Sequence, residues 1–422
     1  MGDMVGTRVE VEITGVAHGG IFIARHGGRV LFVSDAIVGE RVVAEITEAH
    51  KKSFWRADTV EVLEPAESRR EHVWPEASVD RAPADRPGGA EFGHIELAAQ
   101  RKLKATVIRE SMQRMAGLDI DVTVEPVQAG DDDGGGGPDV TGVGWRTRTR
   151  LQVASDGTPG PYSARSHSVV PVSDLPLAVR EAREVAPLDE RFAGHDWVDI
   201  IVPSTGNPFV TVGRARRRQR PHRIVERVGE RDFALDVHGF WQVHRHAPAT
   251  LTAAVQQAID PDAFDESAAN LDLYGGVGLL AAAVGDRFGA GVHITTVESD
   301  PRATDYAAGN LSDWAGASAV TSRVDRYLSH GFDQWTDAER SRVRAGTVVL
   351  DPPRAGAGAG VVGALASLDP AQIVYVACDP VALARDVGLF RQHGWDVSAL
   401  RAFDLFPHTH HVEVVAALRR GH

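Results

Sequence analysis

Short runs of alternating hydrophobic and polar residues, separated by glycine pairs, fill the first 62 residues of the chain. This alternation predicts half-buried β-strands, and Gly19-Gly20 and Gly27-Gly28 predict tight turns between them. Five such strands are typical of a small barrel of the oligonucleotide-binding type, although a purely structural β module has the same pattern. The predicted strands cover residues 9–13, 21–24, 29–33, 42–46 and 55–63.

The hydrophobic pattern is weaker between residues 63 and 235, for which we expect a central α+β domain. Residues 64–98 are rich in proline, alanine, glycine and charge, and they read as a linker or an irregular shell. A helix is predicted over residues 96–115, ended by Gly117, and strands are predicted over residues 144–153 and 198–212. The acidic, glycine-rich run 131–138 is expected to be a disordered loop.

From about residue 270 the pattern changes to hydrophobic strands that alternate with helical stretches. That alternation predicts a doubly wound parallel sheet, so we expect an α/β, Rossmann-like domain over residues 236–422. Sheets of this kind bind ligands at the carboxyl ends of their strands. The predicted strands cover residues 270–274, 293–298, 347–351, 373–377 and 414–418.

The composition, 43% hydrophobic and 24% charged, is that of an ordinary globular protein. No run of about 18 apolar residues predicts a membrane span, and the first residues carry charge and lack an apolar signal core, which predicts a cytoplasmic location. The single cysteine excludes an internal disulfide and a cysteine-rich metal or iron–sulfur site. Nothing implies an obligate protein partner or a membrane partner, and we expect a monomer.

The formal charge of −13 argues against a protein that coats nucleic acid indiscriminately, but local basic surfaces are still possible. The segment 214–231 holds eight arginines, and Arg146, Arg148 and Arg150 alternate along one predicted strand. Both are candidate phosphate-binding surfaces, with a solvated charged face as the alternative. The predicted barrel adds cationic and aromatic groups suited to single-stranded RNA. These groups are Arg25, His26, Arg41, Lys51, Lys52, Phe54 and Trp55.

The strand at 270–274 leads into the glycine turn Gly275-Gly276-Val277-Gly278 and then a helix. Glycines let the backbone approach a bound nucleoside closely, and Glu298 ends the next strand, where a carboxylate can bind ribose hydroxyls. The three-glycine phosphate motif of nicotinamide cofactors is absent. A nucleoside without a pyrophosphate, such as S-adenosylmethionine, fits better, with a simple packing turn as the alternative.

Two further predicted strands are followed by residues suited to catalysis. Asp351 is followed by Pro352-Pro353-Arg354, which suits a rigid wall beside a reacting base but could also be a mere turn. Cys378 precedes Asp379, a natural N-cap, and Pro380, a natural first helical residue. A helix N-terminus favours the thiolate, whereas the Asp379 charge opposes it. We interpret Cys378 as a nucleophile rather than a core residue.

The chain ends with a histidine-rich run and a carboxylate. His408, His410 and His411 suggest a metal site, but their spacing matches neither a zinc protease motif nor a zinc finger, so no metal is expected. Glu413 opens the last hydrophobic strand, where a carboxylate is out of place unless it faces a site.

In these motifs the chain resembles the RNA uracil-C5 methyltransferase family, which acts on bacterial ribosomal RNA and on transfer RNA. Residues 1–62 resemble its N-terminal TRAM domain, and the match from Phe240 onward to its catalytic domain is close. The resemblance implies that Gln242, Tyr274, Glu298 and Asp351 contact the methyl donor S-adenosylmethionine or the target base. It also implies that Cys378 is the nucleophile and Glu413 the proton acceptor.

The sequence departs from this family at three points. Many members hold an iron–sulfur cluster with four cysteines in the region that matches 63–165, and this chain has none there. Gly275 stands where cysteine is frequent, and Asp379 where asparagine is common. Two alternatives remain, a methyltransferase for another RNA base position and a catalytically silent RNA-binding protein. A cytosine-C5 enzyme commonly uses a second cysteine, which this chain lacks.

Overall fold

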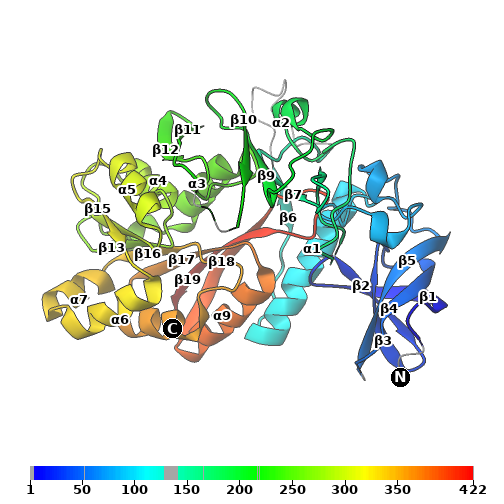
Figure 1. Cartoon of the computed structure of the whole chain (residues 1–422). Coiled ribbons are helices and arrows are strands. Elements are labelled where there is room, and N and C mark those ends of the chain that lie inside the picture. The colour runs from blue at the N-terminus through cyan, green and yellow to red at the C-terminus, as the bar shows by residue number, and fades with distance from the viewer. Residues whose placement is uncertain are drawn as a thin grey trace.

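The computed structural model describes residues 4–51, 53–127, 141–164, 166–215, 217 and 219–421. Figure 1 shows a barrel at one end of the molecule, a large sheet with helices at the other, and a less regular part above both. The run 131–138, expected to be disordered, lies outside the described residues. Within those residues, no helix is long and apolar enough to cross a membrane.

The N-terminal part is a closed barrel with the strand order β1-β2-β3-β5-β4, as the alternating pattern predicts. Alternation turns every second side chain inward, so Phe22 and Leu31 are fully buried while their neighbours are partly exposed. The strands are β1 (Arg8–Ala17), β2 (Ile21–His26), β3 (Arg29–Ser34), β4 (Arg41–Glu48) and β5 (Phe54–Glu64).

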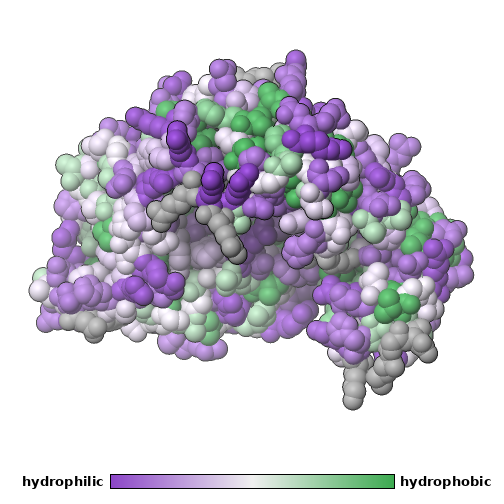
Figure 2. Space-filling model, in the orientation of Figure 1, coloured by the Kyte–Doolittle hydropathy of each residue, from purple (hydrophilic) through white to green (hydrophobic). Residues whose placement is uncertain are grey.

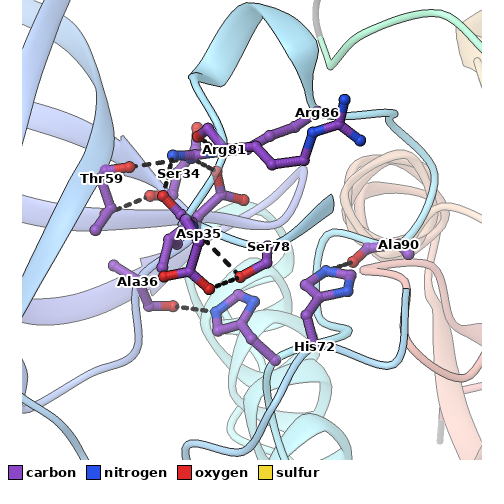
Figure 3. Close-up of polar contacts among 12 residues, drawn as sticks. Ser34, Asp35, Ala36, Thr59, His72, Ser78, Arg81, Arg86 and Ala90 are labelled. Atoms are coloured by element: carbon purple, nitrogen blue, oxygen red, sulfur yellow. Dashed lines mark hydrogen bonds and ion pairs between the residues drawn. The ribbon is translucent and has the colours of Figure 1, made fainter. Parts of the chain in front are cut away.

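The segment after the barrel is held on the barrel surface by polar contacts (Figure 3). The Arg86 guanidinium donates to Asp35 Oδ2 at 2.6 Å and to the Thr59 carbonyl at 3.0 Å. Arg69 donates to Glu40 Oε2 at 2.8 Å, and this carboxylate is fully buried. The segment expected to be a linker or irregular shell therefore has a defined shape. Its short 3-10 turns are η1 (Pro75–Ala77) and η2 (Pro83–Asp85).

The central part contains a four-stranded sheet in the order β10-β9-β7-β8 and a separate hairpin, β11-β12. Its core is formed around Trp145, Leu151, Val198 and Ile200, which are all buried. The elements are β7 (Arg148–Val153), β8 (Pro159–Gly160), α2 (Arg180–Val185), β9 (Trp197–Ile201), β10 (Phe209–Gly213), β11 (Arg223–Val228) and β12 (Arg231–Asp236).

The C-terminal part is an eight-stranded, mostly parallel sheet in the order β15-β14-β13-β16-β17-β19-β18-β6, with helices on both faces (Figure 1). This arrangement confirms the predicted doubly wound fold. The strands are β6 (Val124–Pro126), β13 (Asn270–Leu273), β14 (Ile294–Glu298), β15 (Ala317–Thr321), β16 (Thr347–Leu350), β17 (Gln372–Ala377), β18 (Trp395–Asp404) and β19 (Glu413–Arg420). The helical elements are α3 (Ala247–Ala258), η5 (Pro261–Ala263), α4 (Leu279–Phe288), α5 (Pro301–Asn310), α6 (Val324–Gln334), α7 (Asp337–Arg344), α8 (Gly358–Leu368) and α9 (Pro380–Gln392).

One segment expected in the central domain joins this sheet instead. The helix α1 (Leu97–Ser111) continues as the π-helical turn η3 (Met112–Ala116) and ends at Gly117, as predicted. The strand β6 then pairs with β18 at the edge of the sheet. Ile108 and Met112 are fully buried in the core that α8 and α9 form on one sheet face, which explains why this segment leaves the central part.

Candidate active site

A cavity of about 840 Å³ lies at the carboxyl ends of β13, β14, β16 and β17. It receives side chains from these strand ends, from the loop after β12 and from the loop before β19. Figure 2 shows a hydrophilic hollow between the part that carries β10–β12 and the part that carries α6 and α9. The cavity brings together all six candidate residues of the sequence, which are Gln242, Tyr274, Glu298, Asp351, Cys378 and Glu413.

Strand pairing places Cys378 and Glu413 next to each other. The last antiparallel pair between β17 and β19 is Ala377 with Val414, so the following residue of one strand meets the preceding residue of the other. Glu413 is 3% exposed, and Cys378 is half-buried at the cavity wall. A thiol and a carboxyl therefore share one corner of the cavity.

Burial and mutual repulsion raise the pKa values of the acidic groups in this corner. Burial and the Asp272 charge raise the pKa of Asp351 to about 7. Burial and the Asp351 charge raise the pKa of Glu413 well above its ordinary value. Burial, Glu413 and Asp351 raise the pKa of Cys378 to about 12, against the opposing effect of Arg354. These groups titrate as a coupled set, in which one ionisation disfavours the next.

The turn after β13 forms the other end of the cavity. Glu298 accepts hydrogen bonds from the backbone N–H groups of Gly276 at 3.2 Å and Asp300 at 2.8 Å, which fixes its carboxylate beside the turn. A Cβ at Gly275 would lie 1.9 Å from Thr296 Oγ1 and 2.4 Å from Asp272 Oδ2, so a side chain there would have to displace both groups. These two groups are buried and hydrogen-bonded to each other at 3.0 Å, which favours glycine at this position.

A buried network that the sequence did not reveal holds the loop after Asp351. Asp386 in α9 is fully buried, and its Oδ2 accepts from the Tyr375 hydroxyl and from the Ala357 backbone N–H, both at 2.7 Å. This contact ties the loop after β16 to the helix that begins after Cys378. The only signal in the sequence was an aspartate on the apolar face of a predicted helix.

The histidines before Glu413 take part in protein contacts. His408 Nε2 lies 2.8 Å from the Thr141 carbonyl, and the His408 N–H donates to Gln100 at 2.8 Å. His410 Nδ1 lies 3.4 Å from Glu91 Oε2. In the described residues, no group of three His, Cys, Asp or Glu side chains could hold a metal ion.

The two candidate basic surfaces differ. Arg148 donates to the carbonyls of Val237 and Gly239, and Arg150 donates to both carboxylate oxygens of Asp199. Arg146 also has an internal acceptor, the Arg148 carbonyl, whereas the Arg150 side chain is still 52% exposed, so a phosphate-binding role of this strand stays a prediction.

Three arginines of the segment 214–231 line a groove of about 460 Å³, and no Asp or Glu among the described residues lines it. Arg216 and Arg218 lie outside the described residues. His238 lines both this groove and the active-site cavity, so the two adjoin. The groove is lined by Arg214, Arg217 and Arg220 together with His195, His222 and His238.

Models of two families match the ends of the chain. A TRAM-domain model matches residues 2–54, which form most of the barrel. A tRNA (uracil-5-)-methyltransferase model matches residues 327–421, which include Asp351, Cys378 and Glu413. The barrel, the doubly wound sheet and the cavity at its strand ends define the class of Rossmann-fold RNA methyltransferases.

Similar proteins extend over the whole chain. A protein of Streptomyces avermitilis, described as an uncharacterized RNA methyltransferase, is 38% identical over 98% of both chains. The 23S rRNA (uracil(1939)-C(5))-methyltransferase RlmD of Alkalilimnicola ehrlichii is 30% identical over 97% of this chain and 96% of its own. The chain belongs to the RNA uracil-C5 methyltransferase family, and S-adenosylmethionine is the methyl donor of this family.

A solved structure has the same fold. The tRNA (uracil-54, C5)-methyltransferase of Pyrococcus abyssi, in complex with S-adenosyl-L-homocysteine, aligns with a TM-score of 0.67. The alignment covers 97% of this chain and 99% of that chain at 20% identity. The similarity extends through the barrel, the central part and the C-terminal sheet.

Proposed function

We propose that this protein transfers a methyl group from S-adenosylmethionine to carbon 5 of one uridine in ribosomal or transfer RNA. The observation that carries the proposal is the adjacency of Cys378 and Glu413 at the ends of β17 and β19. Glu298 and the turn after β13 line the same cavity, so the methyl donor would bind at that end and the target base beside Cys378 and Glu413. We further propose that the protein acts as a monomer in the cytoplasm.

The chemistry requires a nucleophile and a base on the target side. The Cys378 thiolate adds to carbon 6 of the uracil, and the ring electrons move to form an enolate. Carbon 5 then attacks the methyl group of the sulfonium, which leaves a neutral thioether. Glu413 removes the proton from carbon 5, and the electrons that remain rebuild the double bond and expel the Cys378 sulfur.

The turn after β13 and the carboxylate beside it indicate where the methyl donor binds. Glu298, fixed by backbone N–H donors, binds the ribose hydroxyls, and Tyr274 and Gln242 line the wall between the ribose and the target base. Asp351 lines the same cavity. The base of a folded RNA reaches this cavity only if it is flipped out of its stack.

Analysis of the methylated nucleoside tests this proposal. Purified protein, tritium-labelled S-adenosylmethionine and unmodified RNA should give label in 5-methyluridine after complete digestion. Ribosomal and transfer RNA are assayed separately, because similar proteins act on each kind. Label in another nucleoside would assign a different base position, and absence of label from both RNA kinds would contradict methyl transfer.

The groove lined by Arg214, Arg217 and Arg220 is a candidate RNA-binding surface on this acidic protein. Replacing Arg214, Arg217 and Arg220 by glutamine should lower the salt slope of RNA affinity by about 2, since each single-strand phosphate contact contributes about 0.7. Affinity for S-adenosylmethionine should not change, because none of the three arginines lines the cavity. Filter binding over a salt series measures the slope.

A matched control removes the same charge elsewhere. Replacing Arg340, Arg342 and Arg344 of α7 by glutamine changes a helix that lines neither the groove nor the cavity. This variant should bind RNA with a nearly unchanged slope. Equal slopes in both triple variants would assign the groove to the solvated alternative.

A further inference from the structure

The N-terminal barrel reaches the residue that follows the candidate nucleophile. His18 lies in the turn between β1 and β2, and its Nε2 is 3.2 Å from Asp379 Oδ2. The same turn packs against the loop before β19, since a Cβ on Gly20 would lie 3.0 Å from the His410 Cβ. A barrel turn therefore contacts both chain segments that carry the candidate catalytic groups.

Asp379 uses its two oxygens for different purposes. Its Oδ1 accepts hydrogen bonds from the backbone N–H groups of Val381 at 3.0 Å and Ala382 at 2.8 Å, and thereby caps α9. Its Oδ2 faces His18. The cap needs only an oxygen acceptor, so the contact with His18 is the interaction that specifically involves the negative charge of Asp379.

Acidic side chains outnumber basic ones around Cys378. Asp351 and Glu413 stand on the neighbouring strand ends, Asp379 follows the cysteine, and Arg354 is the cation of the loop after β16. Each carboxylate disfavours a thiolate, and Asp379 is among the groups that raise the Cys378 pKa. His411 faces the cavity from the loop before β19, and burial with the neighbouring His410 lowers its pKa to about 3, so it adds no cation at neutral pH.

We propose that His18 is a positioning residue whose contact with Asp379 Oδ2 offsets the negative charge beside Cys378 and so favours the thiolate of this cysteine. The biological meaning of this inference rests on the proposed function, whereas the effect itself concerns only the ionisation of the Cys378 thiol. Burial raises the pKa of Asp379, yet the hydrogen bond from His18 and the cap hydrogen bonds lower it overall, which favours the anionic carboxylate that His18 contacts. The barrel thus contributes a group to the active site in addition to any contact with RNA.

The test uses the fact that the chain has one cysteine, so alkylation reports on Cys378 alone. The thiolate displaces iodide from iodoacetamide, so the rate at a fixed pH follows the thiolate fraction. His18→Ala should slow alkylation about tenfold, which corresponds to about one pKa unit. Asp379→Asn keeps an oxygen acceptor for the cap and removes the charge, so it should make alkylation faster.

The decisive comparison is the double variant. If His18 acts through the Asp379 charge, His18→Ala should have little effect when Asp379 is already asparagine, and the shift of the alkylation pH profile should disappear with it. His26→Ala, at the far end of β2, is the matched barrel control and should leave the rate unchanged. Equal slowing by His18→Ala in both backgrounds, or no slowing in either, would overturn the proposal.

This experiment needs neither RNA nor methyl donor, so its failure is distinguishable from failure of the proposed function. If the variants show the expected alkylation rates but no 5-methyluridine forms, the proposed function is contradicted and the His18 inference is supported. If 5-methyluridine forms but His18→Ala does not change the alkylation rate, the His18 inference is contradicted and the proposed function is supported.

Discussion

Methyl transfer is expected to stop when Cys378 is replaced by alanine, with a loss of at least about 10⁴-fold in kcat, as for other enzymes that lose a covalent nucleophile. Carbon 5 of uracil is a poor nucleophile until a thiolate has added to carbon 6, and the described cavity offers no other thiol. A tritium-methyl assay measures the loss.

Binding of S-adenosylmethionine should survive this substitution, because the proposed donor site lies at the ends of β13 and β14 whereas Cys378 follows β17. Calorimetric titration of the Cys378→Ala variant should therefore give the wild-type affinity. Cys378→Ser, which keeps the shape of the side chain, is the matched control for packing and should be equally inactive. Turnover near the wild-type rate in either variant would exclude the nucleophile.

Local sequence was sufficient wherever a motif and the strand that presents it are contiguous. Cys378 follows a fully buried hydrophobic run, and the parallel order of β16 and β17 brings Asp351 to the same edge. Because carboxyl ends of parallel strands meet at one edge, motifs far apart in the sequence could be assigned to one site.

Contacts between distant segments were beyond sequence reasoning. Lys104 of α1 donates to Asp404 Oδ1 at 2.6 Å across 300 residues, and both side chains are nearly inaccessible. No local sequence pattern predicts that Asp404 is the partner of Lys104. Strand β15 was also missed, because its side chains are only partly buried at the edge of the sheet and its hydrophobic signal is weak.

The arginine strand shows a related limit. Alternation correctly predicts that Arg148 and Arg150 point to one face, but it does not say what that face meets. The structure places the Asp199 carboxylate of β9 and the carbonyls after β12 there. The same holds for His18, whose role depends on how the barrel sits against α9.

Replacing Glu413 by glutamine is expected to trap a covalent protein–RNA complex. Glutamine fills the same space but cannot remove the proton from carbon 5, so the methylated base stays bonded to Cys378. The substitution also removes one of the charges that raise the Cys378 pKa, so the addition step should not be impaired. Release of product should fall by about 10² to 10⁴-fold, and denaturing electrophoresis of labelled RNA should show a protein-linked band.

Product release by the wild-type protein should depend on pH, because Glu413 is buried. The pKa of Glu413 is raised, so in the wild-type protein its basic form becomes more populated as pH rises, and product release should accelerate in that direction. The Glu413→Gln variant has no such group and should release product at a low rate that does not follow this titration.

The Cys378→Ala/Glu413→Gln double variant must give no protein-linked band, since the bond to the RNA is made by the cysteine sulfur. Free 5-methyluridine product at a near-normal rate from Glu413→Gln would instead identify a different proton acceptor, with Asp351, whose pKa is raised to about 7, as the neighbouring carboxyl to replace next.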